Sequence, residues 1–513
     1  MGIRKLKNQF ENEVVGVYFE NKGCLGMRIN ILSLRMKKII YVSLLTIATS
    51  LRVNGYENPL FRDIAFQESA NFLISLYEIS RNPASYMYSH PDDYVYYKIG
   101  SIDKLNKFRR TYDPGRERNY NLFFKASKIL DEKSMVAAAA IYIRNDKFHM
   151  YRSLEKNFYE NYFSIIDTTI GNIKYDGPQL WFLYNRTLLK NLIAGLEINY
   201  GVERGLKDVY TKCITIIRNI DAQLGLGYQS NDKNTFIGSH IRYFSRQGKY
   251  SAVKEAIDAK VITFFGYHVY RNEIPRSTVR KSDYREGYEI GGQLEKRNIL
   301  TGGFGMKISG SCGSKSTNVE LGSTAVPCPR GYWVREGYRV VGNLNYSPEH
   351  SKFGLQFFYE NKKYSDWAKS GSYDVVIIEN DESSNRFGST LLIKPLDRID
   401  ISAGLDIENI HSKYHEYIVY FNYDKKRSNW TTFGEIQTII NPVLSANFRA
   451  SLSKIEPFFY WGVDDLKISS IQVGVERIFV FATIGIDFVY EVWEPENADK
   501  NIETYGLSIS YKK

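Results

Sequence analysis

The sequence has little that would build a helical membrane protein. Beyond its N-terminal region we find no stretch of about 20 apolar residues, the length a helix needs to cross a bilayer. The mean hydropathy of -0.35 and the hydrophobic content of 43% are ordinary values for a water-soluble chain. The sequence therefore argues against membrane-spanning helices.

Cysteine is scarce, with four residues among 513. Cys24 lies in a segment that we do not expect in the mature protein, and Cys213 stands alone. Cys312 and Cys328 bracket a stretch rich in Gly, Ser and Thr. In an oxidising compartment this pair could form a disulfide, and two free thiols are the alternative.

Signatures of catalysis or of metal binding are also missing. There are seven histidines, and the only close pair, His411 and His415, falls near a turn between two strand patterns. On a strand this spacing separates the two side chains by about 13 Å, too far to share a metal ion. No nucleophile elbow or phosphate-binding loop is present. We therefore expect no enzyme, no catalytic or metal site and no cofactor.

The positive charge is not concentrated anywhere. The net charge is +11, but Lys and Arg alternate with Asp and Glu, and runs such as Lys425-Lys426-Arg427 are short. A nucleic-acid-binding protein would cluster its basic residues on one face or helix. We expect no nucleic-acid partner, and solvated loops or an anionic membrane surface account for the charge.

The abundant residues are those of strands and turns. The chain has 40 Tyr, 29 Phe and 38 Gly. Aromatic residues favour strands and mark membrane interfaces, whereas glycine favours tight turns. Strands should therefore dominate the fold.

The sequence contains the parts of an export signal, although the signal does not begin at residue 1. Met36 precedes Lys37-Lys38, an apolar core over residues 39–51, and small residues before a cleavage site after Gly55. This is the order of parts in a secretory signal peptide. We predict that residues 1–35 result from a start site placed too early, that Met27 or Met36 is the initiator, and that residues 36–55 are the signal. A buried core segment over residues 39–51 is the alternative.

From about residue 116 onward, apolar and polar residues alternate with a period of two. In residues 398–408, Ile399, Ile401, Ala403, Leu405 and Ile407 share one face. Residues 477–490 continue the same alternation, and residues 505–511 end the chain with a strand bearing Tyr, Leu and Ile on one face. Soluble sandwiches and propellers show this period as well. The export signal, the lack of linkers and the lack of a blade-length repeat favour a membrane barrel.

The fold class predicted is therefore all-β, an antiparallel transmembrane β-barrel of about 14–18 strands over residues 116–513. Residues 56–115 should form a periplasmic or plug-like segment, partly helical because residues 63–80 have helical spacing of apolar residues. The expected location is the cell outer membrane of a Gram-negative bacterium. The expected partners are outer-membrane lipid, lipopolysaccharide and the barrel-assembly machinery, although Lys512-Lys513 follow the last aromatic residue and weaken the insertion signal.

Charged residues on the polar faces of the strand patterns are the nearest candidates for a site. A buried unpaired charge is costly, so these side chains should pair across the lumen or meet water. Cross-strand pairs that merely fill the barrel are one interpretation, and a path for a solute is the other. The candidates are Arg335, Arg339, Arg398, Asp400, Asp406, Glu408, Arg449 and Asp487.

Several motifs in the first half resemble a family of uncharacterised outer-membrane β-barrel proteins of the Bacteroidetes. They are Asn58-Pro59-Leu60, Asp167-Thr168-Thr169, the segment Gly205–Tyr210 and Gly225-Leu226-Gly227-Tyr228. The resemblance covers residues 56–230. It implies a β-barrel fold and an outer-membrane location, and it assigns no catalytic residues.

Two functions are compatible with these features. The first is a channel or uptake component for a small solute. The second is a non-conducting barrel whose outer loops, especially residues 271–285 and 311–331, bind a partner or a surface component.

Overall fold

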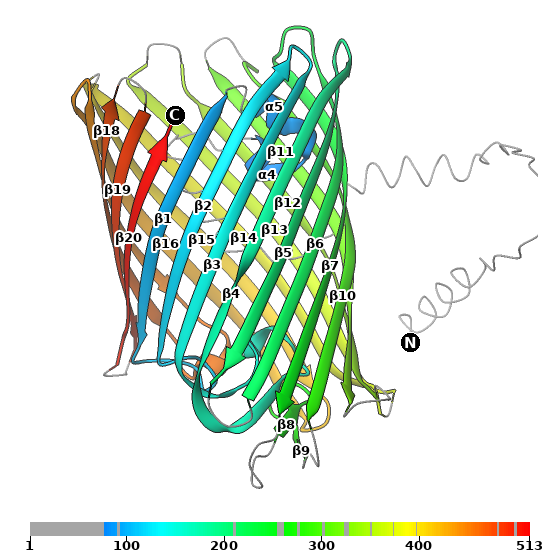
Figure 1. The fold of residues 1–513 in the computed structure, drawn as a ribbon. Coiled ribbons are helices and arrows are strands. Elements are labelled where there is room, and N and C mark those ends of the chain that lie inside the picture. The colour runs from blue at the N-terminus through cyan, green and yellow to red at the C-terminus, as the bar shows by residue number, and fades with distance from the viewer. Residues whose placement is uncertain are drawn as a thin grey trace, which may run out of the picture. The chain divides into compact units, whose positions relative to one another are not determined.

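The chain folds as a nearly all-antiparallel β protein in the computed structural model (Figure 1). The structure describes residues 76–89, 93–208, 212–253, 261–273, 278–299, 303–322, 328–348, 351–372, 374–396, 398–479, 482–496 and 500–513. The predicted signal peptide and the residues before it lie outside this set.

The strands form one sheet that closes on itself. Each barrel strand pairs with its neighbours in the sequence, β7 pairs with β10, and β1 pairs with β20 to close the ring. Of the 20 strands in the sheet, β8 and β9 stand outside the ring, which leaves a closed barrel of 18. The predicted all-β class is therefore confirmed, and the strand number falls at the upper end of the expected range.

The first half of the barrel contains β1 (Tyr94–Asn106), β2 (Arg116–Asp131), β3 (Ser134–Ser153), β4 (Ile165–Leu189), β5 (Leu192–Lys207), β6 (Lys212–Gln229), β7 (Thr235–Val253), β10 (Val279–Lys296) and β11 (Phe304–Gly322). The second half contains β12 (Cys328–Tyr346), β13 (Phe353–Ser370), β14 (Val376–Leu396), β15 (Ile399–Glu416), β16 (Phe421–Asn441), β17 (Leu444–Ile455), β18 (Leu466–Phe479), β19 (Ala482–Pro495) and β20 (Ile502–Lys512). The remaining strands are β8 (Val261–Phe264) and β9 (Tyr270–Glu273), and β8 pairs with the start of β4.

Two boundaries differ from the sequence prediction. The barrel begins at Tyr94 and not at residue 116, because β1 supplies the strand that β20 needs to close the ring. The run 477–490 is not one strand, because the chain reverses between Phe479 and Ala482. The phase of the alternation changes at the reversal, because the outward residues are odd-numbered in β18, such as Val475, and even-numbered in β19, such as Ile486. Residues 478–482 are all apolar, so the sequence hides this change of phase.

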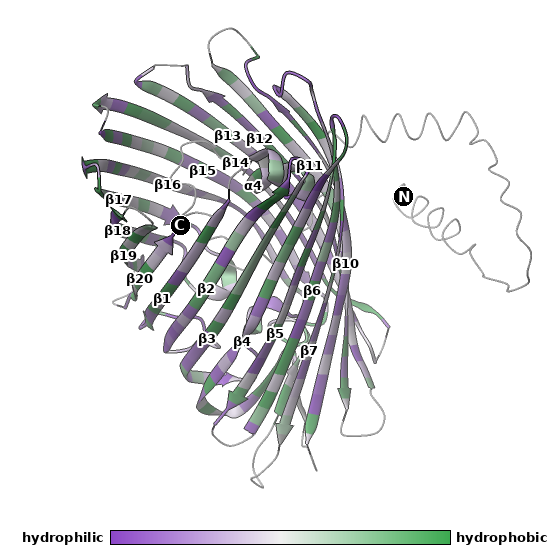
Figure 2. Ribbon diagram, turned by 45° about the horizontal axis from the view of Figure 1, so that its top comes forward, coloured by the Kyte–Doolittle hydropathy of each residue, from purple (hydrophilic) through white to green (hydrophobic). Residues whose placement is uncertain are grey.

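The apolar face of the strands points outward. Ile99 and Leu224 are 63% and 62% exposed on the outer surface, whereas their neighbours Lys98 and Gln223 face the lumen and are buried. The alternation along each strand is visible in Figure 2. Tyr120, Tyr142, Tyr200, Tyr243 and Tyr288 are also exposed on the outer face. An apolar band with aromatic residues is the surface that a barrel presents to lipid.

The two ends of the barrel differ in the length of their connections. The strand pairs β2–β3, β4–β5, β16–β17 and β18–β19 are joined by only two residues each at the end that also holds Tyr94 and Lys512. The opposite end carries the long connections, including residues 154–164, 456–465 and the β8–β9 hairpin (Figure 1). Since short turns are periplasmic and long loops are extracellular in such barrels, we assign the long connections to the outer end.

The N-terminal segment, residues 76–89, lies inside the periplasmic end of the barrel. It consists of α4 (Leu76–Ser80), η1 (Pro83–Ser85) and α5 (Tyr86–Ser89). Asn82 donates hydrogen bonds of 3.1 Å to the carbonyl oxygens of Leu226 and Ser239, and Tyr77 donates one of 2.8 Å to Glu197. The wall accommodates the segment at inward-facing glycines, since a Cβ at Gly195 would lie 2.4 Å from the Ala84 nitrogen.

Candidate functional site

The outer mouth of the lumen is crossed by residues 154–164, which we name the inward loop. The loop leaves β3 and returns to β4, yet its side chains reach the opposite part of the wall. Glu155 forms an ion pair of 2.6 Å with Lys281 of β10, and Tyr162 donates a hydrogen bond of 3.1 Å to Asp366 of β13. Because β5, β6 and β7 separate these strands in the wall, the loop can make both contacts only through the lumen.

Aromatic side chains pack around the tip of the inward loop. We name this group the mouth cluster. The rings of Tyr162 and Trp333 lie 5.6 Å apart, and those of Tyr267 and Tyr414 lie 5.7 Å apart. The cluster contains Tyr162, Phe163, Trp333 and Tyr414, with Phe265, Tyr267, Phe421, Tyr423, Phe458 and Phe459 packed against them. These rings come from loops and from strand ends around the mouth, so they hold the inward loop in place and narrow the opening.

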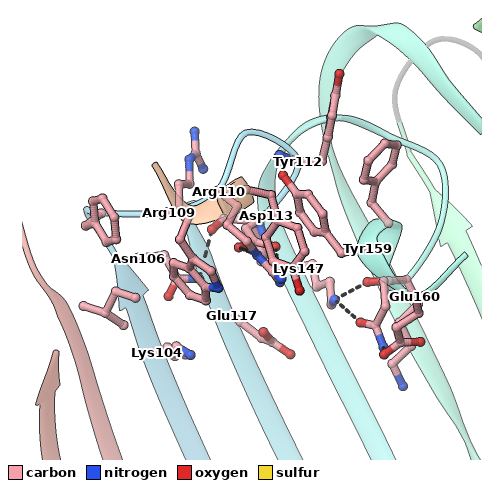
Figure 3. Close-up of a pocket in the computed structure, with 18 of the residues that line it drawn as sticks. Lys104, Asn106, Arg109, Arg110, Tyr112, Asp113, Glu117, Lys147, Tyr159 and Glu160 are labelled. Atoms are coloured by element: carbon pink, nitrogen blue, oxygen red, sulfur yellow. Dashed lines mark hydrogen bonds and ion pairs between the residues drawn. The ribbon is translucent and has the colours of Figure 1, made fainter. Parts of the chain in front are cut away.

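A pocket of about 380 Å³ opens beside the mouth cluster (Figure 3). Its walls come from the β1–β2 connection, the inward loop, η3 (Phe459–Trp461) and the outer ends of β1, β2, β3, β19 and β20. The lining residues are Lys104, Asn106, Phe108, Arg109, Arg110, Tyr112, Asp113, Pro114, Glu117, Lys147, Lys156, Asn157, Phe158, Tyr159, Glu160, Tyr460, Trp461, Trp493 and Ile502. The pocket thus combines basic groups with flat aromatic surfaces.

Arg110 organises one side of this pocket. Its guanidinium makes two hydrogen bonds to Asp113, of 2.8 and 3.0 Å, and lies 4.1 Å from the ring centre of Tyr159. It also stacks near Trp461, at 4.9 Å. Such contacts fix a guanidinium strongly because charge-assisted bonds and ring stacking act together. Opposite, the Lys104 ammonium lies 4.7 Å from the ring centre of Trp493.

Glu160 marks the inner end of the pocket. The residue lies in η2 (Phe158–Glu160) of the inward loop and accepts a hydrogen bond from the Asn157 amide. Burial raises the pKa of Glu160 to about 7, although Arg246 and Arg285 favour its charged form. A carboxyl group in this state changes its charge near neutral pH.

Seven of the eight predicted lumen residues lie on barrel strands. Arg335 forms an ion pair with Asp366, Arg339 with Glu360 at 2.8 Å, and Glu408 with Lys362 at 2.8 Å. In all these pairs the side chains share the face opposite the lipid-exposed residues.

The remaining predicted residues on strands also have partners of opposite charge. Asp406 pairs with Arg386 at 2.8 Å, Asp400 with Lys394 at 3.0 Å and Arg449 with Glu435 at 3.8 Å. Asp487 lies 3.9 Å from Lys98 of β1. Arg398 does not belong to this group, because β15 begins at Ile399 and Arg398 is an exposed residue of the preceding turn.

Of the two alternatives left open for Cys312 and Cys328, the structure has the free thiols and no disulfide. The β11–β12 register places Cys312 opposite Tyr338 and Cys328 opposite Leu321, so the two thiols lie at different heights of the same strand pair. At a rise of about 3.3 Å per residue, this register holds them too far apart for a disulfide.

The two stretches predicted as outer loops are mostly strand. Residues 279–285 belong to β10, and residues 311–322 and 328–331 belong to β11 and β12. Their Ser- and Gly-rich composition suggested loops, but small polar residues also suit the lumen side of long strands that rise above the membrane. The connections that shape the mouth are instead residues 107–115, 154–164 and 456–465.

The pocket residues were not predicted from the sequence. A signal was available in the aromatic runs Phe158–Phe163 and Pro457–Trp461, which lack the alternation of a barrel strand. The described residues contain no group of three or more His, Cys, Asp or Glu that could hold a metal ion. They also include no helix that is long and apolar enough to span a membrane.

Comparison with known proteins gives likeness only at the level of the fold. No protein-family profile and no curated protein sequence matches the chain. Among solved structures, the siderophore receptor PiuA from Acinetobacter baumannii aligns with a TM-score of 0.44 and 8% identity, covering 82% of each chain. The copper transporter OprC aligns at 0.48 and 8%, covering 79% of this chain and 63% of its own. The CymD monoaromatic hydrocarbon channel aligns at 0.33 and 12%, covering 86% and 93%.

The architecture by itself defines where the protein resides. A closed barrel of 18 antiparallel strands with a lipid-facing apolar band, a polar lumen and unequal loops is the form of bacterial outer-membrane proteins. The chain is an outer-membrane β-barrel protein.

Proposed function

We propose that the barrel is a channel for uptake of a small solute, which enters at the mouth pocket and passes along one side of the lumen. The observation that carries this proposal is the exposure of charged side chains on the inner wall of β14–β17. Arg386 and Arg449 are 30% and 31% exposed, and Asp406 is 22% exposed, although all three face the lumen. These groups therefore meet water inside the barrel.

The two sides of the lumen are unequal. On the β2–β13 side the inner wall is covered by the N-terminal segment at one end and by the inward loop at the other. On the β17–β20 side the inward positions carry small residues such as Ser451, Gly474, Gly506 and Ser508. Small side chains leave room for water and solute between the two obstructions.

Single-channel recording in planar bilayers tests this proposal. We expect reproducible conductance steps from the purified barrel. Ser508→Trp, which would place an indole in the lumen, should reduce the step size. Leu507→Trp is the matched control, since Leu507 is the adjacent residue, lies on the lipid face and is 53% exposed. A silent wild-type protein, or equal effects of the two variants, would contradict the channel.

The second candidate function is a barrel that binds a partner through its outer loops. The turn between β15 and β16 favours this candidate, because Tyr417, Ile418, Val419 and Tyr420 are all exposed and Tyr420 reaches 85%. An exposed apolar tip beyond the lipid-facing band is typical of a contact surface. A silent barrel in the bilayer experiment would favour this second function.

Three finer assignments extend the proposal. We place the chain with the uncharacterised Bacteroidetes barrels that it resembles over residues 56–230. We propose lipopolysaccharide as the lipid contact above the aromatic residues of the outer face. The terminal strand β20 would be the segment that the barrel-assembly machinery engages. Removal of the predicted signal is checked by the mature N-terminus, which should be Tyr56.

A further inference from the structure

Like charges face one another across neighbouring strands on the inner wall. Arg246 of β7 is the direct register partner of Arg285 of β10, and Lys315 of β11 is the direct partner of Arg335 of β12. All four side chains point into the lumen, since each lies an odd number of positions along its strand from a lipid-exposed residue. These exposed residues are Tyr243, Tyr288, Ile308 and Leu344. Like charges directly opposite one another destabilise a sheet.

Neighbouring cations on the same wall are neutralised by acidic partners. Arg335 pairs with Asp366, Lys281 pairs with Glu155 at 2.6 Å, and Arg242 pairs with Asp221. Each of these three cations therefore belongs to an ordinary ion pair.

Arg285 differs from them. It is only 8% exposed, donates a hydrogen bond of 3.2 Å from Nε to Thr317, and lies 4.9 Å from the ring centre of Trp333. Among the described residues, no carboxylate lies within ion-pair distance of its guanidinium. Burial of a guanidinium without a counter-ion is costly, and an anion bound beside Arg285 would offset this cost.

Other charged side chains surround Arg285. Arg246 faces Arg285 directly, and Lys315 lies two residues along β11 from Thr317, the residue that Arg285 contacts. The inner end of the mouth pocket adjoins these cations through Glu160, whose ionisation Arg246, Arg285 and Lys315 all influence. Two further acidic groups lie near these cations: Asp283, which is 3.9 Å from Lys281, and Glu203, which acts on Arg246.

We propose that Arg246, Arg285 and Lys315 form a binding site for an oxyanion, a phosphate, sulfate or carboxylate group, on the inner wall of β7, β10 and β11, near Glu160 of the mouth pocket. The inference deepens the proposed function, on which it rests, because it makes the preferred solute anionic. A guanidinium presents two parallel N–H donors to such a group, and the second arginine and the lysine add charge around it. The rings at the mouth would hold an organic portion of the same solute.

Phosphate is the probe for this site. In planar bilayers we expect chloride to permeate in preference to potassium, and inorganic phosphate to block the chloride current. Arg285→Gln should weaken the block by about tenfold, which corresponds to about 1.4 kcal/mol. Arg285→Lys should retain part of it. Arg297→Gln is the matched control, since it removes one arginine charge that is paired with Glu295, at 2.7 Å, just beyond the periplasmic end of β10. Normal heat-modifiable migration in gels verifies that each variant folds.

Phenyl phosphate distinguishes a free anion from an anionic organic solute. A tighter block by phenyl phosphate than by phosphate would identify an organic anion, whereas equal blocks would identify the free oxyanion. Both results support the site.

A second measurement separates the site from the channel. Phosphate should raise the Tm of the detergent-solubilised wild type and leave the Tm of Arg285→Gln unchanged. A silent barrel that phosphate stabilises would keep the site and overturn the channel. A conducting barrel that phosphate neither blocks nor stabilises, or a block that Arg285→Gln leaves intact, would overturn the site.

Discussion

Tyr162 of the inward loop donates its phenolic hydrogen to Asp366 on the opposite wall, at 3.1 Å. Asp366 is fully buried and also binds Arg335 and Asn380. The hydrogen bond therefore connects a loop that leaves β3 with a charged network on β12, β13 and β14. It fixes the position of the loop across the lumen.

Removal of this hydrogen bond should free the loop. A bond to a charged group contributes about 1.5–3 kcal/mol, so Tyr162→Phe should loosen the loop while leaving the barrel intact. We expect larger and noisier single-channel steps and faster protease cleavage within residues 154–164. Tyr417→Phe is the control, since it removes a 2.7 Å bond from Tyr417 to Glu379 at an exposed turn. Identical behaviour of the two variants would show that the Tyr162 bond does not hold the loop.

A methyl group at Gly195 should displace the N-terminal segment. The Cβ would lie 2.4 Å from the Ala84 nitrogen and 2.6 Å from the Pro83 carbonyl carbon, and backbone atoms cannot move aside locally. Overpacking of this kind costs about 1–3 kcal/mol. We expect Gly195→Ala to expose residues 76–89 to protease and to lower the Tm. Gly434→Ala, where nothing lies within 4 Å of the added Cβ, should change neither.

The inward loop should respond to pH through Glu160. Its pKa is about 7 in the folded protein and near 4.5 when exposed, so the fold binds the proton more tightly between these values. Stability of the loop is therefore greatest below about pH 4.5 and falls as pH rises to about 7. We expect protease cleavage of the loop to accelerate between pH 5 and pH 8.

Two variants test whether Glu160 causes the pH dependence of cleavage. Glu160→Gln removes the ionisation and should make cleavage independent of pH over the same range. His268→Gln is the control, because His268 with Glu416, at 2.6 Å, is another titratable pair at the mouth. A response that disappears in His268→Gln and persists in Glu160→Gln would assign the pH dependence to the histidine.

The three described cysteines report the orientation of the barrel. Cys328 is exposed at the outer end of β12, Cys312 is partly buried and Cys213 is buried. A membrane-impermeant maleimide applied to intact cells should label Cys328, whereas Cys213 should react only after unfolding. Cys328→Ser provides the control for specific labelling. Labelling of Cys328 only after cell disruption would reverse the assignment of the outer and periplasmic ends.

The sequence by itself determined the fold class and the lipid-facing surface. Residues 398–408 alternate with a period of two, and a strand in a barrel wall has only two faces, so the apolar set Ile399, Ile401 and Leu405 had to share one of them. The alternation also placed Arg339, Asp406 and Arg449 on a common face with respect to their own strands. It could not show the reversal between Phe479 and Ala482, since residues 478–482 are all apolar and conceal the change of phase at the turn.

The tertiary structure alone decided which charges meet and which segments enter the lumen. The pairing of Tyr162 with Asp366 joins residues 204 positions apart, and the opposition of Arg246 and Arg285 depends on the β7–β10 register, which skips the β8–β9 hairpin. The alternation of apolar and polar residues determines which face of a strand each side chain occupies. It carries no information about the register between strands or about loops that fold into the lumen. The choice between a disulfide and free thiols at Cys312 and Cys328 stayed open for the same reason, because a short sequence separation along two paired strands does not determine the height at which each thiol lies.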